Sequence, residues 1–132
     1  MEWKCTVCGI ENSFTTRMCV GGCGFSFIQA RLVLTETESK KQLKMHVTTD
    51  VGYLLIKTIA ENKSNTVSEF QFKIIKSETL GGWFVCHFPS ALNQTLLNGD
   101  TISSSDPVQV ISGDVLSIGR GSLKLFVTLE DK

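Results

Sequence analysis

Residues 93–119 read NQTLLNGDTISSSDPVQVISGDVLSIG and carry the clearest signals of the fold. Three short runs rich in Val, Leu, Ile and Thr, at 95–97, 108–111 and 115–118, are separated by polar and Gly-containing breaks. Asn98-Gly99 is the strongest short hairpin signal, because both residues tolerate the positive φ angles of a tight turn. Gly113, directly before Asp114, marks a second turn. The stretch therefore predicts closely spaced β-strands.

The same pattern extends towards the N-terminus as far as residue 25 and towards the C-terminus as far as residue 129. We expect further strands at 25–35, 42–48, 53–59, 70–76, 83–88 and 123–129, with a hairpin loop at 35–41. In the run 70–76, Phe70, Phe72 and Ile74 should face one way. Gln71 and Lys73 should face the other, because strand side chains alternate. No long amphipathic helix is indicated, so the prediction is an all-β sandwich.

Length, composition and charge limit the classes of function. The chain has 132 residues, of which 42% are hydrophobic, and its formal net charge is zero. A neutral chain lacks the broad positive field that drives non-specific nucleic-acid binding. No apolar run approaches the roughly 20 residues of a membrane span, and the N-terminus lacks an apolar signal stretch. We therefore expect a cytoplasmic protein, or a nuclear one in a eukaryote, without a membrane partner.

Four of the five cysteines lie close together near the N-terminus. Cys5 and Cys8 form one close pair, and Cys19 and Cys23 form a second pair ten residues later. Two such pairs can place four thiolates around one tetrahedral Zn²⁺ ion, with no coordination position left for a reactive water. The alternative is a group of free or redox-active thiols. We predict a structural zinc module at 1–24, whose folding energy comes from the metal, and a β-domain at 25–132.

Two residues beside the cysteines make the zinc module more specific. With Trp3 before Cys5 and Asn12 after Cys8, it resembles the zinc finger of the Ran-binding-protein type, although that family has one residue fewer in its second knuckle. Such fingers bind single-stranded RNA or ubiquitin. The resemblance leaves nucleic acid as an unfavoured partner, because only Arg17 stands near the family's RNA-contacting arginines. The ubiquitin-binding Thr-Phe pair is replaced by residues 9–10, Gly-Ile. The third interpretation of the zinc module is that it is only a structural cap on the β-domain.

Residues 29–130 resemble a forkhead-associated (FHA) domain. The patches that match are Val51-Gly52-Tyr53, Trp83-x-Val85, Asn93-x-Thr95-x2-Asn98-Gly99 and Gly113-Asp114-Val115-Leu116-Ser117-Ile118-Gly119. The resemblance implies a β-sandwich that binds phosphothreonine peptides of a partner protein, as in signalling, through loops at one end. The peptide-binding residues that the resemblance implies are Tyr53, Lys57, Ser68, Glu69, Gln71, Asn93 and Thr95.

This chain departs from the family at the residues that would hold the phosphate. Tyr53 stands where the family has an Arg, and Glu69 and Gln71 stand where it has an Arg and a His. A phosphate carries a charge of about −1.5 to −2 at neutral pH and is bound best by Arg. Lys57 and Lys63 are the remaining cations. We therefore predict an adaptor that binds a partner protein without needing phosphothreonine, or associates with itself, through the same loops or a sandwich face. A phosphothreonine reader and a purely structural sandwich are the alternatives.

The sequence predicts no catalytic residue and no cofactor besides zinc. His46 and His87 each lie in an apolar run. Cys86 precedes His87, but neighbouring strand residues point to opposite faces and so do not form a nucleophile–base pair.

Overall fold

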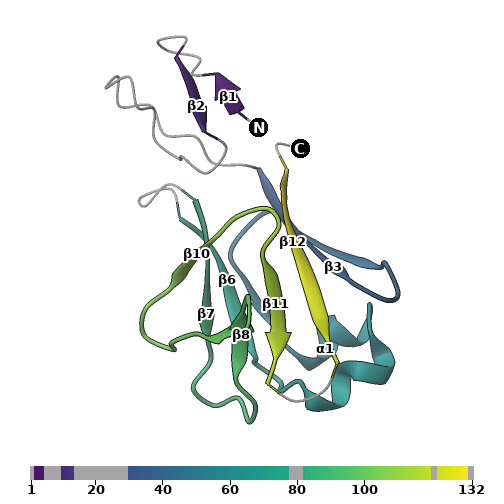
Figure 1. Ribbon diagram of the computed structural model, residues 1–132. Helices are drawn as coiled ribbons and strands as arrows, with labels where there is room; N and C mark the ends of the chain where they lie inside the picture. Colours follow the sequence, from purple (N-terminus) through teal and green to yellow (C-terminus); the bar gives the residue numbers. More distant parts are fainter. Residues whose placement is uncertain (1, 5–9, 14–29, 78–81, 120–121, 131–132) are drawn as a thin grey trace.

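The computed structural model describes residues 2–4, 10–13, 30–77, 82–119 and 122–130. From residue 30 onward these residues form two antiparallel sheets that face each other across one core (Figure 1). The strand order is β10-β7-β6-β5 in one sheet and β4-β3-β12-β11-β8-β9 in the other. The predicted β-sandwich is therefore confirmed for this part of the chain.

The strands are short, and two small helices follow β5. The strand bounds are β1 Glu2–Lys4, β2 Glu11–Ser13, β3 Arg31–Glu36, β4 Gln42–Met45, β5 Thr49–Val51, β6 Phe72–Ser77, β7 Gly82–His87, β8 Thr95–Leu97, β9 Asp100–Thr101, β10 Val108–Val110, β11 Val115–Ile118 and β12 Lys124–Glu130. The helices are α1 (Tyr53–Lys57) and the 3₁₀ helix η1 (Glu61–Thr66).

The predicted turns form as their chemistry requires. Asn98 and Gly99 have φ angles of 53° and 88° and join β8 to β9, so the two-residue hairpin is confirmed. Gly113, with φ 99°, joins β10 to β11, which lie in different sheets. Asp114 accepts the Ile111 N–H at this turn and also the side-chain amide of Asn98. Asn98 and Asp114 therefore tie the two turns together.

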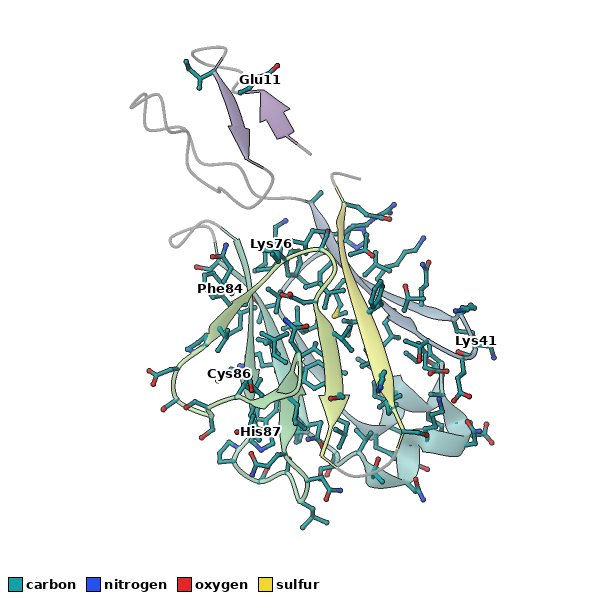
Figure 2. All side chains as sticks on the ribbon, in the orientation of Figure 1. Glu11, Lys41, Lys76, Phe84, Cys86 and His87 are labelled. Carbon is teal, nitrogen blue, oxygen red and sulfur yellow. The ribbon has the colours of Figure 1, made fainter. Side chains whose placement is uncertain are left out.

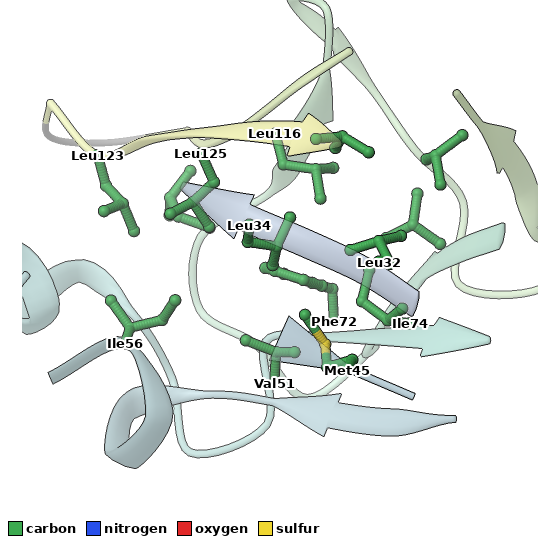
Figure 3. Close-up of a cluster of buried hydrophobic side chains, with 14 of the residues drawn as sticks. Leu32, Leu34, Met45, Val51, Ile56, Phe72, Ile74, Leu116, Leu123 and Leu125 are labelled. Atoms are coloured by element: carbon green, nitrogen blue, oxygen red, sulfur yellow. The ribbon is translucent and has the colours of Figure 1, made fainter. Parts of the chain in front are cut away.

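The core is the apolar layer between the two sheets (Figure 3). Its largest fully buried side chains include Trp83, Phe72, Leu34 and Leu125. Inner-face residues alternate along β12, where Leu125, Val127 and Leu129 are buried. Burying this apolar surface supplies most of the favourable free energy of folding.

The structure corrects the strand predicted at 53–59. These residues form α1 and the turn after it. Ile56, Ile59 and the following Ala60 are buried, while Leu54 is 75% exposed. Buried positions at i, i+3 and i+4 follow the helical period. The segment is apolar because one side of a short helix covers the end of the sandwich.

Two further strand predictions need correction. The expected strand 42–48 ends at Met45, and β5 is a separate strand that pairs with β6 in the other sheet. In the run 70–76, Phe70 is 47% exposed and Gln71 is fully buried, the reverse of their predicted faces. Both precede β6, so the strand alternation begins only at Phe72.

The zinc module is described only in part. Strands β1 and β2 pair as a hairpin, with Trp3 opposite Asn12. The four cysteines and the proposed boundary at residues 24–25 lie outside the described residues.

Candidate functional site

Two loops meet at Ser68, which is bonded to the first residue of α1, the helix at one end of the sandwich (Figure 1). The Tyr53 N–H donates to the Ser68 carbonyl oxygen over 2.9 Å. The Leu92 N–H donates to Ser68 Oγ, also over 2.9 Å. Ser68 therefore joins the start of α1 to the loop between β7 and β8. We call residues 53–57, 66–71 and 88–95 the loop edge. It contains all seven residues predicted from the resemblance.

Part of the loop edge is a buried polar cluster. Gln71, fully buried, accepts the Ser68 N–H at Oε1 over 3.0 Å. Its Nε2 donates to the Asn93 carbonyl oxygen over 2.7 Å and to Thr95 Oγ1 over 3.1 Å. The Asn93 side chain donates to the Thr66 carbonyl oxygen over 2.9 Å. Gln71 and Thr95 are thus inside the protein, where they hold the loops in place and present no surface to a peptide.

His87 completes the buried cluster. Its Nδ1 lies 2.9 Å from Thr95 Oγ1, and burial lowers the pKa of the imidazole. Its neighbour Cys86 is partly exposed on the other face of β7. The two side chains are therefore on opposite sides of the sheet, as predicted, and His87 is a packed core residue.

The ammonium group of Lys63 is held between the carboxylates of Glu36 and Glu38, which lie outside the loop edge. Its Nζ lies 3.0 Å from Glu36 Oε2 and also contacts Glu38 Oε1. Glu38 and Glu36 raise the pKa of Lys63, which stays charged but is neutralised locally. Lys63, one of the two cations expected to reach the ligand, is thus occupied by internal partners.

The Glu36 carboxylate at the centre of this ion cluster is almost completely buried. Burial alone raises its pKa, but the backbone N–H groups of Ser39 and Glu38 and the Lys63 ammonium outweigh that effect and lower it to about 2. The cluster therefore pins η1 to the hairpin between β3 and β4.

The remaining predicted residues are accessible at the loop edge. Tyr53 is partly buried, and Lys57 Nζ lies 5.7 Å from the centre of its ring. Glu69 is exposed beside Ser68. Among the described residues no carboxylate forms an ion pair with Lys57. The accessible charges are thus one cation and one anion, where a phosphate site needs several donors.

Two exposed leucines at the loop edge were not identified from the sequence. Leu92 is 91% exposed and Leu54 is 75% exposed. The sequence did contain a signal for Leu92. It is an isolated Leu among Ser90, Ala91 and Asn93 in a loop, where its side chain has no core to pack into. The edge therefore offers two exposed apolar side chains in addition to its single accessible cation and anion.

The described residues include no group of three or more His, Cys, Asp or Glu side chains placed to hold a metal. Cys5, Cys8, Cys19 and Cys23 are outside this set, so the zinc site remains a prediction. Within the same residues, no helix has the length and apolar character of a membrane span.

No protein-family model and no curated protein matches this chain. Solved structures do. The FHA domain of an Arabidopsis thaliana hypothetical protein matches with a TM-score of 0.62 and 20% identity, over 79% of this chain and 89% of that chain. The N-terminal FHA domain of S. cerevisiae Rad53p, in complex with a phosphothreonine peptide, matches with a TM-score of 0.52 and 17% identity, over 76% and 94%.

Mycobacterium tuberculosis EmbR, in complex with a low-affinity phosphopeptide, matches with a TM-score of 0.60 and 16% identity, over 89% of this chain and 28% of that chain. At these identities the similarity concerns the fold. The part of the chain from residue 30 onward thus has the FHA fold.

Proposed function

We propose that this chain is a non-catalytic interaction module whose loop edge binds a partner protein without requiring phosphothreonine. The observation that supports this most directly is Leu92, which is 91% exposed beside Ser68. Large apolar side chains exposed in this way are characteristic of protein-binding surfaces when they cluster. Leu54, 75% exposed, and Tyr53 lie on α1, whose first residue is hydrogen-bonded to Ser68.

The charges of the loop edge support the same reading. A phosphate needs bidentate or multiple cationic donors, and each missing charge-assisted hydrogen bond weakens its binding. Here the Arg position holds Tyr53, Lys63 is neutralised by Glu36 and Glu38, and Glu69 adds an exposed carboxylate. Ser68 Oγ already accepts a backbone N–H. An uncharged, partly apolar peptide segment suits this surface better than a doubly charged phosphate.

A phosphothreonine reader is the second candidate. Two structures with the same fold, those of Rad53p and EmbR, contain phosphopeptides. Lys57, without a carboxylate partner in the described residues, could supply one positive charge to a bound phosphate. This candidate depends on a single Lys where Arg gives the stronger contact.

We also propose that the N-terminal module holds one structural Zn²⁺ ion. The hairpin of β1 and β2 pairs Lys4 with Glu11, so the segment that carries Cys5 and Cys8 connects two paired strands. Four thiolates from Cys5, Cys8, Cys19 and Cys23 would fill a tetrahedral site, and zinc would then supply folding energy. Single-stranded RNA or ubiquitin would be the alternative ligands of this module, beside its role as a cap.

The decisive experiment compares two displayed random-peptide libraries, one unphosphorylated and one with a fixed phosphothreonine. We expect the unphosphorylated library to yield peptides whose binding is measurable by isothermal titration calorimetry. Replacing Leu92 with Ser should weaken their binding about tenfold, because one apolar contact is lost. Val47→Ser is the matched control, since Val47 is 67% exposed but lies between β4 and β5, outside the loop edge.

The opposite result would support the second candidate. Binding only of phosphothreonine peptides, abolished by Ser68→Ala, would identify a phosphopeptide reader. An RNA role would instead show as affinity for single-stranded oligonucleotides that falls steeply with salt and depends on Trp3 and Arg17.

A further inference from the structure

The outer face of the four-stranded sheet exposes apolar side chains. Along β7, Trp83, Val85 and His87 are buried, while Phe84 and Cys86 are partly exposed on the opposite face (Figure 2). The register places Phe84 beside Ile75 of β6, which is also partly exposed. A sheet face that only met water would carry polar side chains at these positions.

A groove lies on this face, beside the end of β7. It has a volume of about 230 Å³ and is lined by residues that include Ile75, Cys86, Phe88, Pro89, Lys73 and Ser104. The His87 N–H donates to the Ser103 carbonyl oxygen over 3.1 Å, so the loop after β9 is fixed along one side. The volume is below the usual range of small-molecule pockets and suits one large side chain.

The groove is continuous with the loop edge. Phe88 lines the groove and also begins the loop that contains Leu92. The ring of Phe88 lies 5.6 Å from that of Phe70, which is 47% exposed and two residues from Ser68. A segment bound at Ser68 therefore has an apolar path across Phe70 and Phe88 into the groove.

A cation stands at the rim of the groove. Lys73 Nζ lies 5.9 Å from the centre of the Phe88 ring. Its contact with Asp50 is 3.8 Å long, and its side chain is 41% exposed. An exposed pair at this distance is weak. The ammonium group is therefore available to a carbonyl or carboxylate oxygen of a bound segment.

We propose that this groove is a second docking point, which takes a bulky apolar side chain from the same partner segment that binds the loop edge. The inference rests on the proposed function, because it extends that binding site along the outer sheet face. The occupant is an extended segment with an apolar residue such as Leu, Met or Phe, together with an oxygen acceptor near Lys73.

The test uses the full chain, zinc-loaded, and the unphosphorylated peptides selected as above. Ser104→Trp places a large ring at the rim of the groove, and Ser105→Trp, at the next exposed position, is the matched control. We expect Ser104→Trp to weaken peptide binding about tenfold or more, since one buried apolar side chain is displaced. Ser105→Trp should bind as the wild type does.

Cys86 supplies an independent measurement. It lines the groove and is a free thiol. A bound peptide should slow its reaction with a maleimide reagent, measured by mass spectrometry on the tryptic peptide 77–120, which contains no other cysteine. The four N-terminal thiols fall in other tryptic peptides and do not disturb the result.

The outcomes separate this inference from the function on which it rests. Peptides that depend on Leu92 but bind Ser104→Trp normally, with Cys86 equally reactive, would overturn the groove alone. If no peptide binds the wild type, both proposals fail. A wild-type dimer that Ser104→Trp dissociates in sedimentation experiments would identify a second copy as the occupant and would overturn the partner segment.

Discussion

Gly52 determines where the loop edge begins. A Cβ atom at this position would lie 1.7 Å from the Glu69 carbonyl oxygen and 2.9 Å from that of Ser68. Both obstacles are backbone atoms, which cannot move without displacing the loop. Only glycine lets the chain pass this closely before α1 begins.

We therefore expect Gly52→Ala to destabilise the protein by several kcal/mol, because the loop carrying Ser68 must shift. Urea unfolding followed by the fluorescence of the buried Trp83 would measure the loss. Gly99→Ala is a useful comparison, since nothing lies within 4 Å of its added Cβ and only its positive φ opposes the change. Equal stability of Gly52→Ala and the wild type would contradict the close approach.

Glu36 makes the free energy of unfolding depend on pH in the acidic range. Its pKa is about 2 in the folded protein, against an ordinary value of 4.5. The depressed pKa contributes stability that is fully present above about pH 4.5 and is lost as the pH falls towards 2, about 3 kcal/mol in all. Urea midpoints measured between pH 2 and 7 should show this fall. Glu36→Gln should flatten it, and an unchanged profile in that variant would assign the dependence to other carboxylates.

At the scale of elements, the loop edge is held by hydrogen bonds that converge on one buried amide. Gln71 connects Ser68 to Asn93 and Thr95, and thereby connects the segment before β6 to the loop before β8. Gln71 is also bonded through its backbone to Val51 and Phe88, and Thr95 pairs with Ile118 of β11, so the side-chain bonds of Gln71 link segments that belong to different sheets. A buried polar network of this kind stabilises one arrangement strongly and costs free energy when it is incomplete.

Gln71→Ala should cost on the order of 2–4 kcal/mol, because it leaves the Ser68 N–H and the Asn93 carbonyl oxygen without their partner. Amide hydrogen exchange should quicken at Ser68 and Leu92 more than in β12. Gln94→Ala is the matched control, since Gln94 is exposed. Exchange that accelerates equally throughout the sandwich would show general destabilisation instead of loosened loops.

The helix α1 shows where the sequence pattern was ambiguous. The run 53–59 is apolar and short, which allows either a strand or a helical turn. Buried Ile56, Ile59 and Ala60 have helical spacing, and this signal was present in the sequence. The choice between the two depended on Gly52 and Ser68, whose contacts direct the chain out of the sheet.

At the scale of the whole molecule, the proposed zinc ion and the apolar core stabilise different parts of the chain. The sandwich has its own core of buried residues between two sheets. A module of about 24 residues is too small to bury a core of its own, so its folding depends on its metal.

Metal removal should therefore act locally. We expect about one Zn²⁺ per chain by atomic absorption, since four thiolates fill one tetrahedral site. Treatment with a strong chelator should abolish the protection of amides in β1 and β2. Thermal unfolding of the sandwich, followed by far-UV circular dichroism, should shift by only a few degrees. A zinc content near zero in protein purified without chelator would contradict the proposed module.

The β-sandwich and its turns could be predicted from the sequence, because alternation, Asn98-Gly99 and Gly113-Asp114 are local signals that act within a few residues. It also located the loop edge, since residue identities at Tyr53, Ser68 and Asn93 could be compared with a known pattern. Which of those residues are accessible could be seen only in the folded protein. Gln71 and Thr95 are buried and support the loops, and Lys63 is ion-paired with two carboxylates. Burial and charge pairing depend on segments distant in sequence.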